Sequence, residues 1–245
     1  MTQAQPSVNG DVAPLRNVTL LDELVKRVMN RPPHLPGMGC FYGHSGYGKT
    51  VAATRAVVVN RAVYVEVGES WTRKKLCTAL LRQVGVPAKR TVADMIEQII
   101  DCLCRTKLPV LVDEADHLAR KGMIEVVREI HDKSGASIVL IGEEMLPELL
   151  SRWERVDNRV LDWVPAQPAS LEDTRHLARL YAPGVEIGQD LLAKIHEAGG
   201  GRVRRICVNL ERARERAAIE GLEIMGLAQW GDEPFFSGRP PARRR

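Results

Sequence analysis

The chain has 245 residues, of which 44% are hydrophobic, 27% are charged and only 4% are aromatic. Its formal net charge of +4 permits a polyanionic partner without requiring one. No apolar run reaches the roughly 18 residues that a membrane helix needs, and the N-terminus lacks the pattern of a signal peptide. These features exclude a membrane-spanning protein, and we expect a soluble, cytoplasmic one.

The five cysteines are Cys40, Cys77, Cys102, Cys104 and Cys207. Their odd number and unpaired spacing argue against a disulfide framework. The two that are closest in sequence have no second pair and no flanking histidines, which argues against a zinc site. We therefore expect reduced thiols, most of them buried.

The N-terminal third begins with a polar segment, residues 1–16, that predicts a flexible arm. Thr19 is expected to cap a helix with an apolar face, which prolines at 32, 33 and 36 then end. The run from Met38 to Tyr42 predicts a short buried strand that leads into a glycine-rich loop. The apolar face of the helix consists of Leu20, Leu21, Leu24, Val25 and Val28.

Predicted helices and strands alternate after the loop. Strands are expected at 62–67, 110–112, 137–141 and 160–164. Helices are expected at about 50–60, from a Ser70 cap to 84, from a Thr91 cap past 103, from the third strand to His131, and at about 144–153. This alternation implies an α/β fold with a parallel sheet covered by helices on both faces.

Pro165 and Pro168 mark a boundary, beyond which the pattern predicts only helices. These helices are expected at about 171–181, 188–198 and 202–219. We therefore divide the chain into a flexible arm (1–16), an α/β core (17–166), a helical lid lobe (167–230) and a basic, disordered tail (231–245).

The glycine-rich loop Gly43-His44-Ser45-Gly46-Tyr47-Gly48-Lys49-Thr50 matches the pattern G-x-x-x-x-G-K-[ST] in full. Its glycines let the backbone curl so that N–H groups face phosphates, and the following helix adds the positive end of its dipole. We expect Lys49 to reach the β- and γ-phosphates and the Thr50 hydroxyl to bind Mg²⁺. The loop therefore predicts binding of ATP with Mg²⁺.

The strand at 110–112 delivers Asp113 and Glu114 at its carboxyl end, where α/β sheets bind ligands. We expect Asp113 to hold Mg²⁺ through water, and Glu114 to polarise the attacking water. An acidic helix start after a strand is common in α/β proteins. The preceding phosphate loop is what favours the functional interpretation.

Together, the two motifs, the additional strands and the helical lobe resemble the AAA+ ATPases over about residues 17–220. The resemblance places Glu143 at the strand tip where many members carry Asn, Thr or Ser to sense the γ-phosphate. It makes Arg155 and Arg159 the preferred candidates for an arginine finger that reaches a neighbouring subunit. Arg204 best matches the second sensor of the lid. Each arginine also fits a solvated basic helix face.

Within the AAA+ ATPases, the run from Val139 to Glu144 and the small lobe resemble the target-DNA activators of transposition, the group that includes the B protein of Mu-like phages. This resemblance implies an ATPase that forms a ring or helical filament on non-specific duplex DNA, selects the insertion target and stimulates a transposase. It also implies a bacterial or phage-infected host cell. The first 16 residues are too short for the additional N-terminal DNA-binding domain of Mu-type proteins.

Candidate DNA contacts are the segment Thr72-Arg73-Lys74-Lys75, after the second strand, and the pair Arg120-Lys121, after the second motif. Their cations can neutralise phosphates, and the threonine can donate a hydrogen bond. A solvated helix start is the alternative for both. The sequence shows no module that reads bases, so we expect sequence-tolerant, salt-dependent binding.

Two other functions remain open on the sequence. A helper ATPase that loads a helicase or another replication protein shares these motifs and would differ in its partner. A switch in which ATP controls protein assembly would bind no DNA. A metabolic kinase is disfavoured, because the acidic pair and distal arginines suit hydrolysis better.

Overall fold

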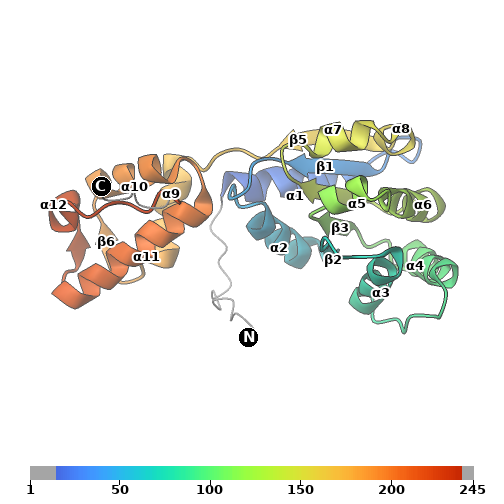
Figure 1. Cartoon of the computed structure of the whole chain (residues 1–245), viewed down its shortest axis with the longest axis horizontal. Helices are drawn as coiled ribbons and strands as arrows, with labels where there is room; N and C mark the ends of the chain where they lie inside the picture. Colours follow the sequence, from blue (N-terminus) through green and yellow to red (C-terminus); the bar gives the residue numbers. More distant parts are fainter. Residues whose placement is uncertain (1–14, 239–245) are drawn as a thin grey trace, which may run out of the picture. The chain divides into compact units, whose positions relative to one another are not determined.

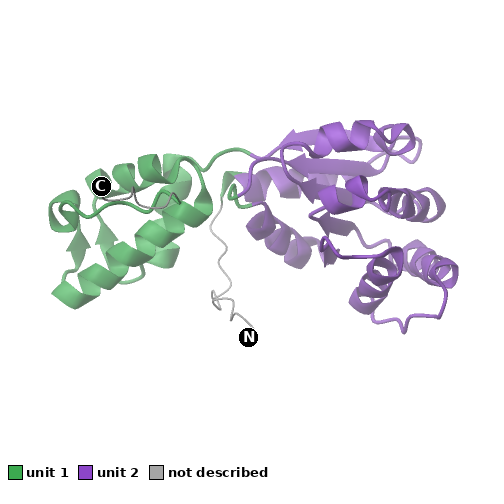
Figure 2. Cartoon of the chain, in the orientation of Figure 1, with its two compact units in different colours: residues 1–16, 46–48, 167–245 green, residues 17–45, 49–166 purple. Residues whose placement is uncertain are grey.

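The computed structural model describes residues 15–238, and the chain forms two compact units (Figure 2). Unit 2 comprises residues 17–45 and 49–166. Unit 1 comprises residues 1–16, 46–48 and 167–245. Residues 1–14 of the expected arm and 239–245 of the expected tail lie outside the described residues.

Unit 2 is built on a parallel sheet of five strands in the order β2-β3-β4-β1-β5 (Figure 1). Strands β3 and β4 are buried along their whole length, as expected for inner strands covered on both faces. This confirms the predicted α/β fold. The strands are β1 (Met38–Tyr42), β2 (Val63–Glu66), β3 (Val110–Asp113), β4 (Ile138–Gly142) and β5 (Val160–Pro165).

Helices separate the strands of unit 2 along the chain. Their apolar faces and the sheet enclose a core in which Leu81, Leu103 and Ile124 are at most 1% exposed. The helices are α1 (Arg16–Met29), α2 (Lys49–Asn60), α3 (Arg73–Gln83), α4 (Val92–Thr106), α5 (Asp116–Arg120), α6 (Ile124–Ser134), α7 (Leu146–Ser151) and α8 (Glu154–Asp157).

Two predicted helix caps in unit 2 are wrong. Helix α1 begins at Arg16, so Thr19 lies within the helix instead of capping it. Ser70 does not cap α3, because the extended residue Thr72 accepts a hydrogen bond from the Lys75 N–H at 3.3 Å. The Thr91 cap of α4 is present as predicted.

The single helix expected from the third strand to His131 is divided into α5 and α6. Gly122 lies between them with φ of +65°, a conformation that favours glycine and interrupts the helical hydrogen bonds. The break leaves α5 as a short helix that follows the acidic motif directly in the sequence.

Unit 1 contains helices, as predicted, but also two short strands that pair in parallel. The strands were missed because each has only two residues and no periodic pattern. The elements are α9 (Leu171–Tyr181), β6 (Glu186–Ile187), α10 (Gln189–Gly199), α11 (Val203–Glu220), β7 (Ile224–Met225) and α12 (Leu227–Trp230).

Part of the segment expected as a disordered tail is anchored to α11. The buried Asn209 side chain donates to the carbonyl of Phe236 at 3.0 Å and accepts from its N–H at 2.8 Å. Phe235 stacks on Trp230 with ring centroids 4.9 Å apart. Residues 231–238 therefore form part of unit 1.

All five cysteines are free thiols. Cys40, Cys77 and Cys102 are buried, whereas Cys104 is exposed and Cys207 is half-buried. Among the helices described between residues 15 and 238, none has the length and apolar character to cross a membrane.

Candidate nucleotide-binding site

The phosphate loop connects the end of β1 to the first turn of α2. Gly46 and Gly48 have φ of +88° and +83°, so the turn uses the backbone freedom of glycine. Helix α2 begins at Lys49, and its free N–H groups therefore lie at the loop. The Lys49 ammonium donates to the carbonyls of Gly43 at 2.6 Å and His44 at 3.1 Å. Burial lowers the pKa of Lys49, although neighbouring carboxylates oppose the shift.

The Asp113 carboxylate at the end of β3 is 2% exposed and accepts hydrogen bonds from three groups. Its Oδ1 accepts the N–H of Glu114 at 2.9 Å. Its Oδ2 accepts the Thr50 hydroxyl at 3.3 Å and the Tyr64 hydroxyl at 3.0 Å. The structure therefore joins the phosphate loop to the second motif, and the Mg²⁺-binding roles expected for Thr50 and Asp113 stay a prediction.

The phenol of Tyr64 is a part of this site that the sequence did not predict. Burial, followed by the charge of Asp113 and the hydrogen bond to it, raises the pKa of Tyr64 far above its ordinary value. The phenol is therefore a protonated donor at all physiological pH values. The available signal was the strand pattern, in which Tyr64 and Glu66 alternate with buried Val63 and Val65.

Glu114 has a strained backbone and a perturbed side chain. Its φ of +54° lies in the left-handed region, which costs a non-glycine residue on the order of 1–3 kcal/mol. Burial first, and then the charges of Asp113 and Asp116, raise the pKa of Glu114, while Lys49 opposes the shift. A carboxylate with a raised pKa is a better proton acceptor than an ordinary glutamate.

Asp116 connects the acidic motif to β4, and the sequence analysis also missed it. Its carboxylate is 2% exposed, and Oδ2 accepts the N–H of Glu143 at 2.9 Å. A Cβ at Gly142 would overlap Asp116 Oδ2, so the strand must end in glycine for the two segments to approach. The backbone of Glu143 is thus fixed directly after β4, while its side chain is exposed.

Thr50 and Asp113 fit the Mg²⁺ site that the motifs predict. They supply a hydroxyl and a carboxylate oxygen, which are hard ligands, from two adjacent segments. Mg²⁺ is usually held by one or two carboxylates together with phosphates and water, so this small donor set is sufficient.

The candidate arginines lie in different surroundings. The Arg159 carbonyl accepts the N–H of Met38, so this arginine is at the start of β1, and the phosphate loop follows the other end of that strand. Arg155 is exposed on α8, and Arg204 is exposed in the first turn of α11 in unit 1. Neither of these two forms an ion pair with any residue between 15 and 238.

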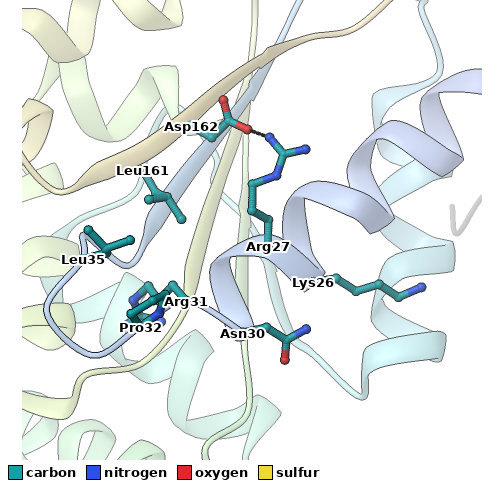
Figure 3. Close-up of a pocket in the computed structure, with 8 residues that line it drawn as sticks. All are labelled: Lys26, Arg27, Asn30, Arg31, Pro32, Leu35, Leu161 and Asp162. Atoms are coloured by element: carbon teal, nitrogen blue, oxygen red, sulfur yellow. Dashed lines mark hydrogen bonds and ion pairs between the residues drawn. The ribbon is translucent and has the colours of Figure 1, made fainter.

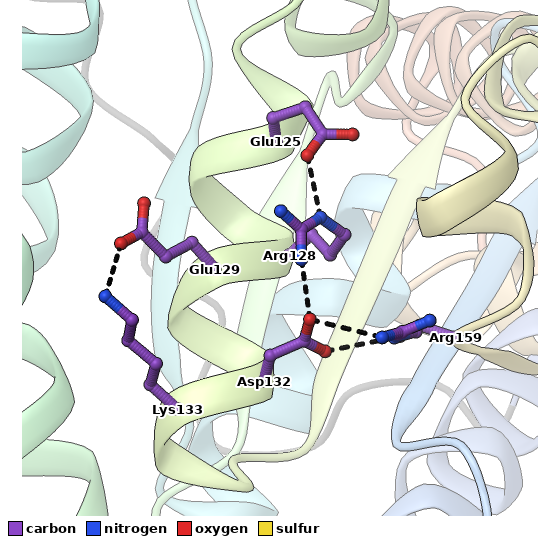
Figure 4. Close-up of polar contacts among 6 residues, drawn as sticks. All are labelled: Glu125, Arg128, Glu129, Asp132, Lys133 and Arg159. Atoms are coloured by element: carbon purple, nitrogen blue, oxygen red, sulfur yellow. Dashed lines mark hydrogen bonds and ion pairs between the residues drawn. The ribbon is translucent and has the colours of Figure 1, made fainter.

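Arg159 is held by α6 through a bidentate contact with Asp132, at 3.0 and 3.3 Å (Figure 4). Arg128 donates to the same carboxylate at 2.6 Å and to Glu125 at 2.7 Å. Burial opposes the effect, but the hydrogen bonds from Arg159 and Arg128 lower the pKa of Asp132. Arg159 is thus paired with an anion in the isolated chain.

The candidate DNA contacts follow adjacent strands of the sheet. Thr72 caps α3, whose first turn begins with Arg73, Lys74 and Lys75, all of them exposed. The exposed pair Arg120-Lys121 ends α5. Since β2 and β3 pair in parallel and each segment follows one of them, both lie toward the carboxyl edge of the sheet.

A basic hollow lies at the β5 edge of the sheet, between the end of α1 and the start of β5 (Figure 3). Arg27 is bonded there to Asp162. The lining residues are Lys26, Arg27, Asn30, Arg31, Pro32, Leu35, Leu161 and Asp162, none of which belongs to a predicted motif.

Comparison with known proteins supports the assignment of the core. Residues 33–150 match the sequence model of the AAA domain. The fold is similar to Cdc6p from Pyrobaculum aerophilum, with 18% identity and a TM-score of 0.67 over 90% of this chain and 66% of that one. It is similar to Aeropyrum pernix ORC1, solved in complex with DNA, with 21% identity and a TM-score of 0.67 over 91% of this chain and 65% of that one. It is also similar to Aeropyrum pernix ORC2 in its ADP form, with 15% identity and a TM-score of 0.70 over 92% of this chain and 69% of that one.

These matches show that the α/β fold, with its central parallel sheet of five strands, is similar to that of AAA+ P-loop NTPases. The chain spans about two thirds of the length of the first two structures. No curated protein matches the chain.

The raised pKa of Glu114 predicts that its charge destabilises the nucleotide-free protein. For an acid whose pKa is raised on folding, stability falls as pH rises through that pKa. Glu114→Gln is neutral at every pH, so its melting temperature should exceed that of the wild type near neutral pH. This difference in melting temperature should disappear as the pH is lowered to the ordinary glutamate pKa of about 4.3. Thermal melts across pH test this, and Glu148→Gln, at an exposed position of α7, is the control. An equal gain in the control, or none in Glu114→Gln, would contradict the prediction.

Proposed function

We propose that this protein binds ATP with Mg²⁺, hydrolyses it to ADP and phosphate, and assembles on duplex DNA in its ATP-bound form without reading the sequence. The observation that carries the proposal is the Asp113 carboxylate, which the Thr50 hydroxyl of the phosphate loop contacts beside Glu114. A glycine turn with an incidental lysine would not require this second, buried acidic segment.

Each residue of the site has a separate role in the proposed hydrolysis of ATP. Lys49 exchanges the carbonyls of Gly43 and His44 for the β- and γ-phosphates, and the remaining loop residues donate backbone N–H groups. Glu114 orients the attacking water and accepts its proton. When bound, Mg²⁺ supplies positive charge to the β- and γ-phosphates. Glu143 would orient a water near the γ-phosphate.

Arg159 is our preferred arginine finger, and it would act on the nucleotide of a neighbouring subunit. Because it lies at the start of β1 and the phosphate loop follows the other end, it is placed away from its own nucleotide. Asp132 presents Arg159 with a planar anion that accepts two hydrogen bonds, as phosphate oxygens do. On assembly, Arg159 would exchange the Asp132 carboxylate for the phosphate of the neighbouring subunit's nucleotide. Arg155 is the alternative finger, and Arg204 is a candidate sensor in the lid.

The DNA-binding part of the proposal rests on α3. Its first turn holds cations and no acidic residue. Each cation there opposes the helix dipole by roughly 0.3–1 kcal/mol, so helix stability does not explain the arrangement. A phosphate backbone would stabilise it, with Thr72 and the Arg120-Lys121 pair adding contacts. The similar ORC1 structure was solved in complex with DNA.

For the biological role, we propose target selection and transposase activation in DNA transposition, which rests on the sequence resemblance. A replication helper that loads a helicase is the second candidate, favoured by the similarity to Cdc6p and ORC structures. The two roles differ in partner. Stimulation of ATP hydrolysis by a transposase would support the first, whereas stimulation by a replicative helicase and not by a transposase would overturn it.

The roles of the two motifs predict opposite behaviour for two variants. Lys49→Ala should abolish ATP binding, because the ammonium that neutralises the phosphates is lost. Glu114→Gln should bind ATP as the wild type does and hydrolyse it at least about 100-fold more slowly, the range expected for loss of a general base. Equilibrium binding of a fluorescent ATP analogue and phosphate release measure the two effects. Lys194→Ala, exposed on α10, is the control. Unchanged affinity in Lys49→Ala would remove the phosphate-loop assignment.

A trans-acting Arg159 predicts complementation between two inactive variants. Arg159→Ala should bind ATP but hydrolyse it poorly. Lys49→Ala should not bind ATP, but this variant retains Arg159. Mixing them should restore part of the hydrolysis, because one subunit then supplies the nucleotide and the other the finger. Arg152→Ala should retain activity, because the exposed Arg152 side chain pairs with Glu148 of α7 and with no other residue between 15 and 238. A mixture no more active than the separate variants would rule out Arg159 as the trans finger.

A further inference from the structure

We propose that Tyr64 is a positioning residue that orients the Asp113 carboxylate for Mg²⁺ and thereby sets the metal affinity of the nucleotide site. This inference rests on the proposed function, since it concerns the same Mg²⁺-nucleotide site. None of the predicted motifs includes Tyr64, which lies in β2.

The register of the sheet explains how Tyr64 reaches the site. In the parallel pair of β2 and β3, Tyr64 is opposite Leu111, and Glu66 is opposite Asp113. Tyr64 is therefore set back from Asp113 by two residues, or about 6.6 Å along the strands. The long phenol side chain spans this offset, and its hydroxyl donates to Asp113 Oδ2 at 3.0 Å.

The hydrogen bonds of Asp113 leave it a single direction for a further ligand. A carboxylate has about four lone-pair sites. One site on Oδ1 accepts the Glu114 N–H, and the two on Oδ2 accept the hydroxyls of Thr50 and Tyr64. The remaining Oδ1 site is the one that can accept a Mg²⁺-bound water. Asp113 is thus oriented before the metal arrives.

The two hydroxyls on Oδ2 have different roles. Thr50 is itself a candidate Mg²⁺ ligand, so its contact with Asp113 depends on how it binds the metal. Tyr64 belongs to the sheet and fixes the carboxylate independently of the phosphate loop. Groups that orient a metal-binding carboxylate in this way typically account for 10–100-fold in metal affinity or activity.

The test is the Mg²⁺ dependence of ADP binding, which does not require hydrolysis. A fluorescent ADP analogue is held at a fixed concentration, Mg²⁺ is titrated, and metal-free ADP affinity is measured separately. In Tyr64→Phe, the Mg²⁺ midpoint should rise about 10–100-fold. Its metal-free ADP affinity should match the wild type, because the aromatic ring is retained, and its melting temperature should fall only modestly, because Asp113 loses one of its three hydrogen bonds. Tyr181→Phe is the matched control, since Tyr181 is a half-buried tyrosine in unit 1 whose hydroxyl contacts Cys207.

A double-mutant cycle separates positioning from a general structural effect. Once Asp113→Asn has removed the carboxylate, adding Tyr64→Phe should cause no further rise in the Mg²⁺ midpoint. Equal midpoints for Tyr64→Phe and the wild type would overturn the inference while leaving the proposed function intact. A lower metal-free ADP affinity in Tyr64→Phe would also overturn it, because the tyrosine would then support the fold of the site. A wild type that binds no nucleotide would overturn the proposed function, and this inference with it.

Discussion

The hydrogen bonding of one buried carboxylate constrains the whole nucleotide site. Asp113 is 2% exposed, and a charge at that depth is costly unless it is hydrogen-bonded. Its donors come from three segments: Thr50 from the phosphate loop, Tyr64 from β2 and the backbone of Glu114. Satisfying the carboxylate therefore also fixes the loop against the sheet and places the proposed base.

The same arrangement stores unfavourable energy that a ligand can relieve. Asp113, Glu114 and Asp116 concentrate negative charge at the end of β3, and Glu114 is also strained. The ammonium of Lys49 lies near these acids and donates to the carbonyls of Gly43 and His44. A bound nucleotide with its metal would add positive charge beside the acids. Such a site lowers the stability of the protein when no nucleotide is bound, as the strain and clustered charges of active sites commonly do.

The sequence was sufficient for features with a strong local signal. The parallel fold followed from the alternation of buried strands and helices, and the contact of Thr50 with Asp113 agrees with the pairing of two motifs. Tyr64 was missed because its role depends on strand register, which a single strand does not encode. Asp116 was missed because its partner, the N–H of Glu143, is distant in sequence. The strands β6 and β7 and the anchored segment 231–238 depend likewise on contacts within unit 1.

The central claim is that ATP controls assembly on DNA, and the most direct measurement is binding to non-specific duplex DNA. Fluorescence anisotropy should be recorded with ATP, with ADP and without nucleotide, at two salt concentrations. Our account predicts tight, cooperative binding only with ATP, and affinity that falls steeply with salt because phosphate contacts release counterions. Binding that is absent or equal in all three nucleotide states would contradict the account, and absent binding would favour an ATP-controlled switch that acts on a protein partner.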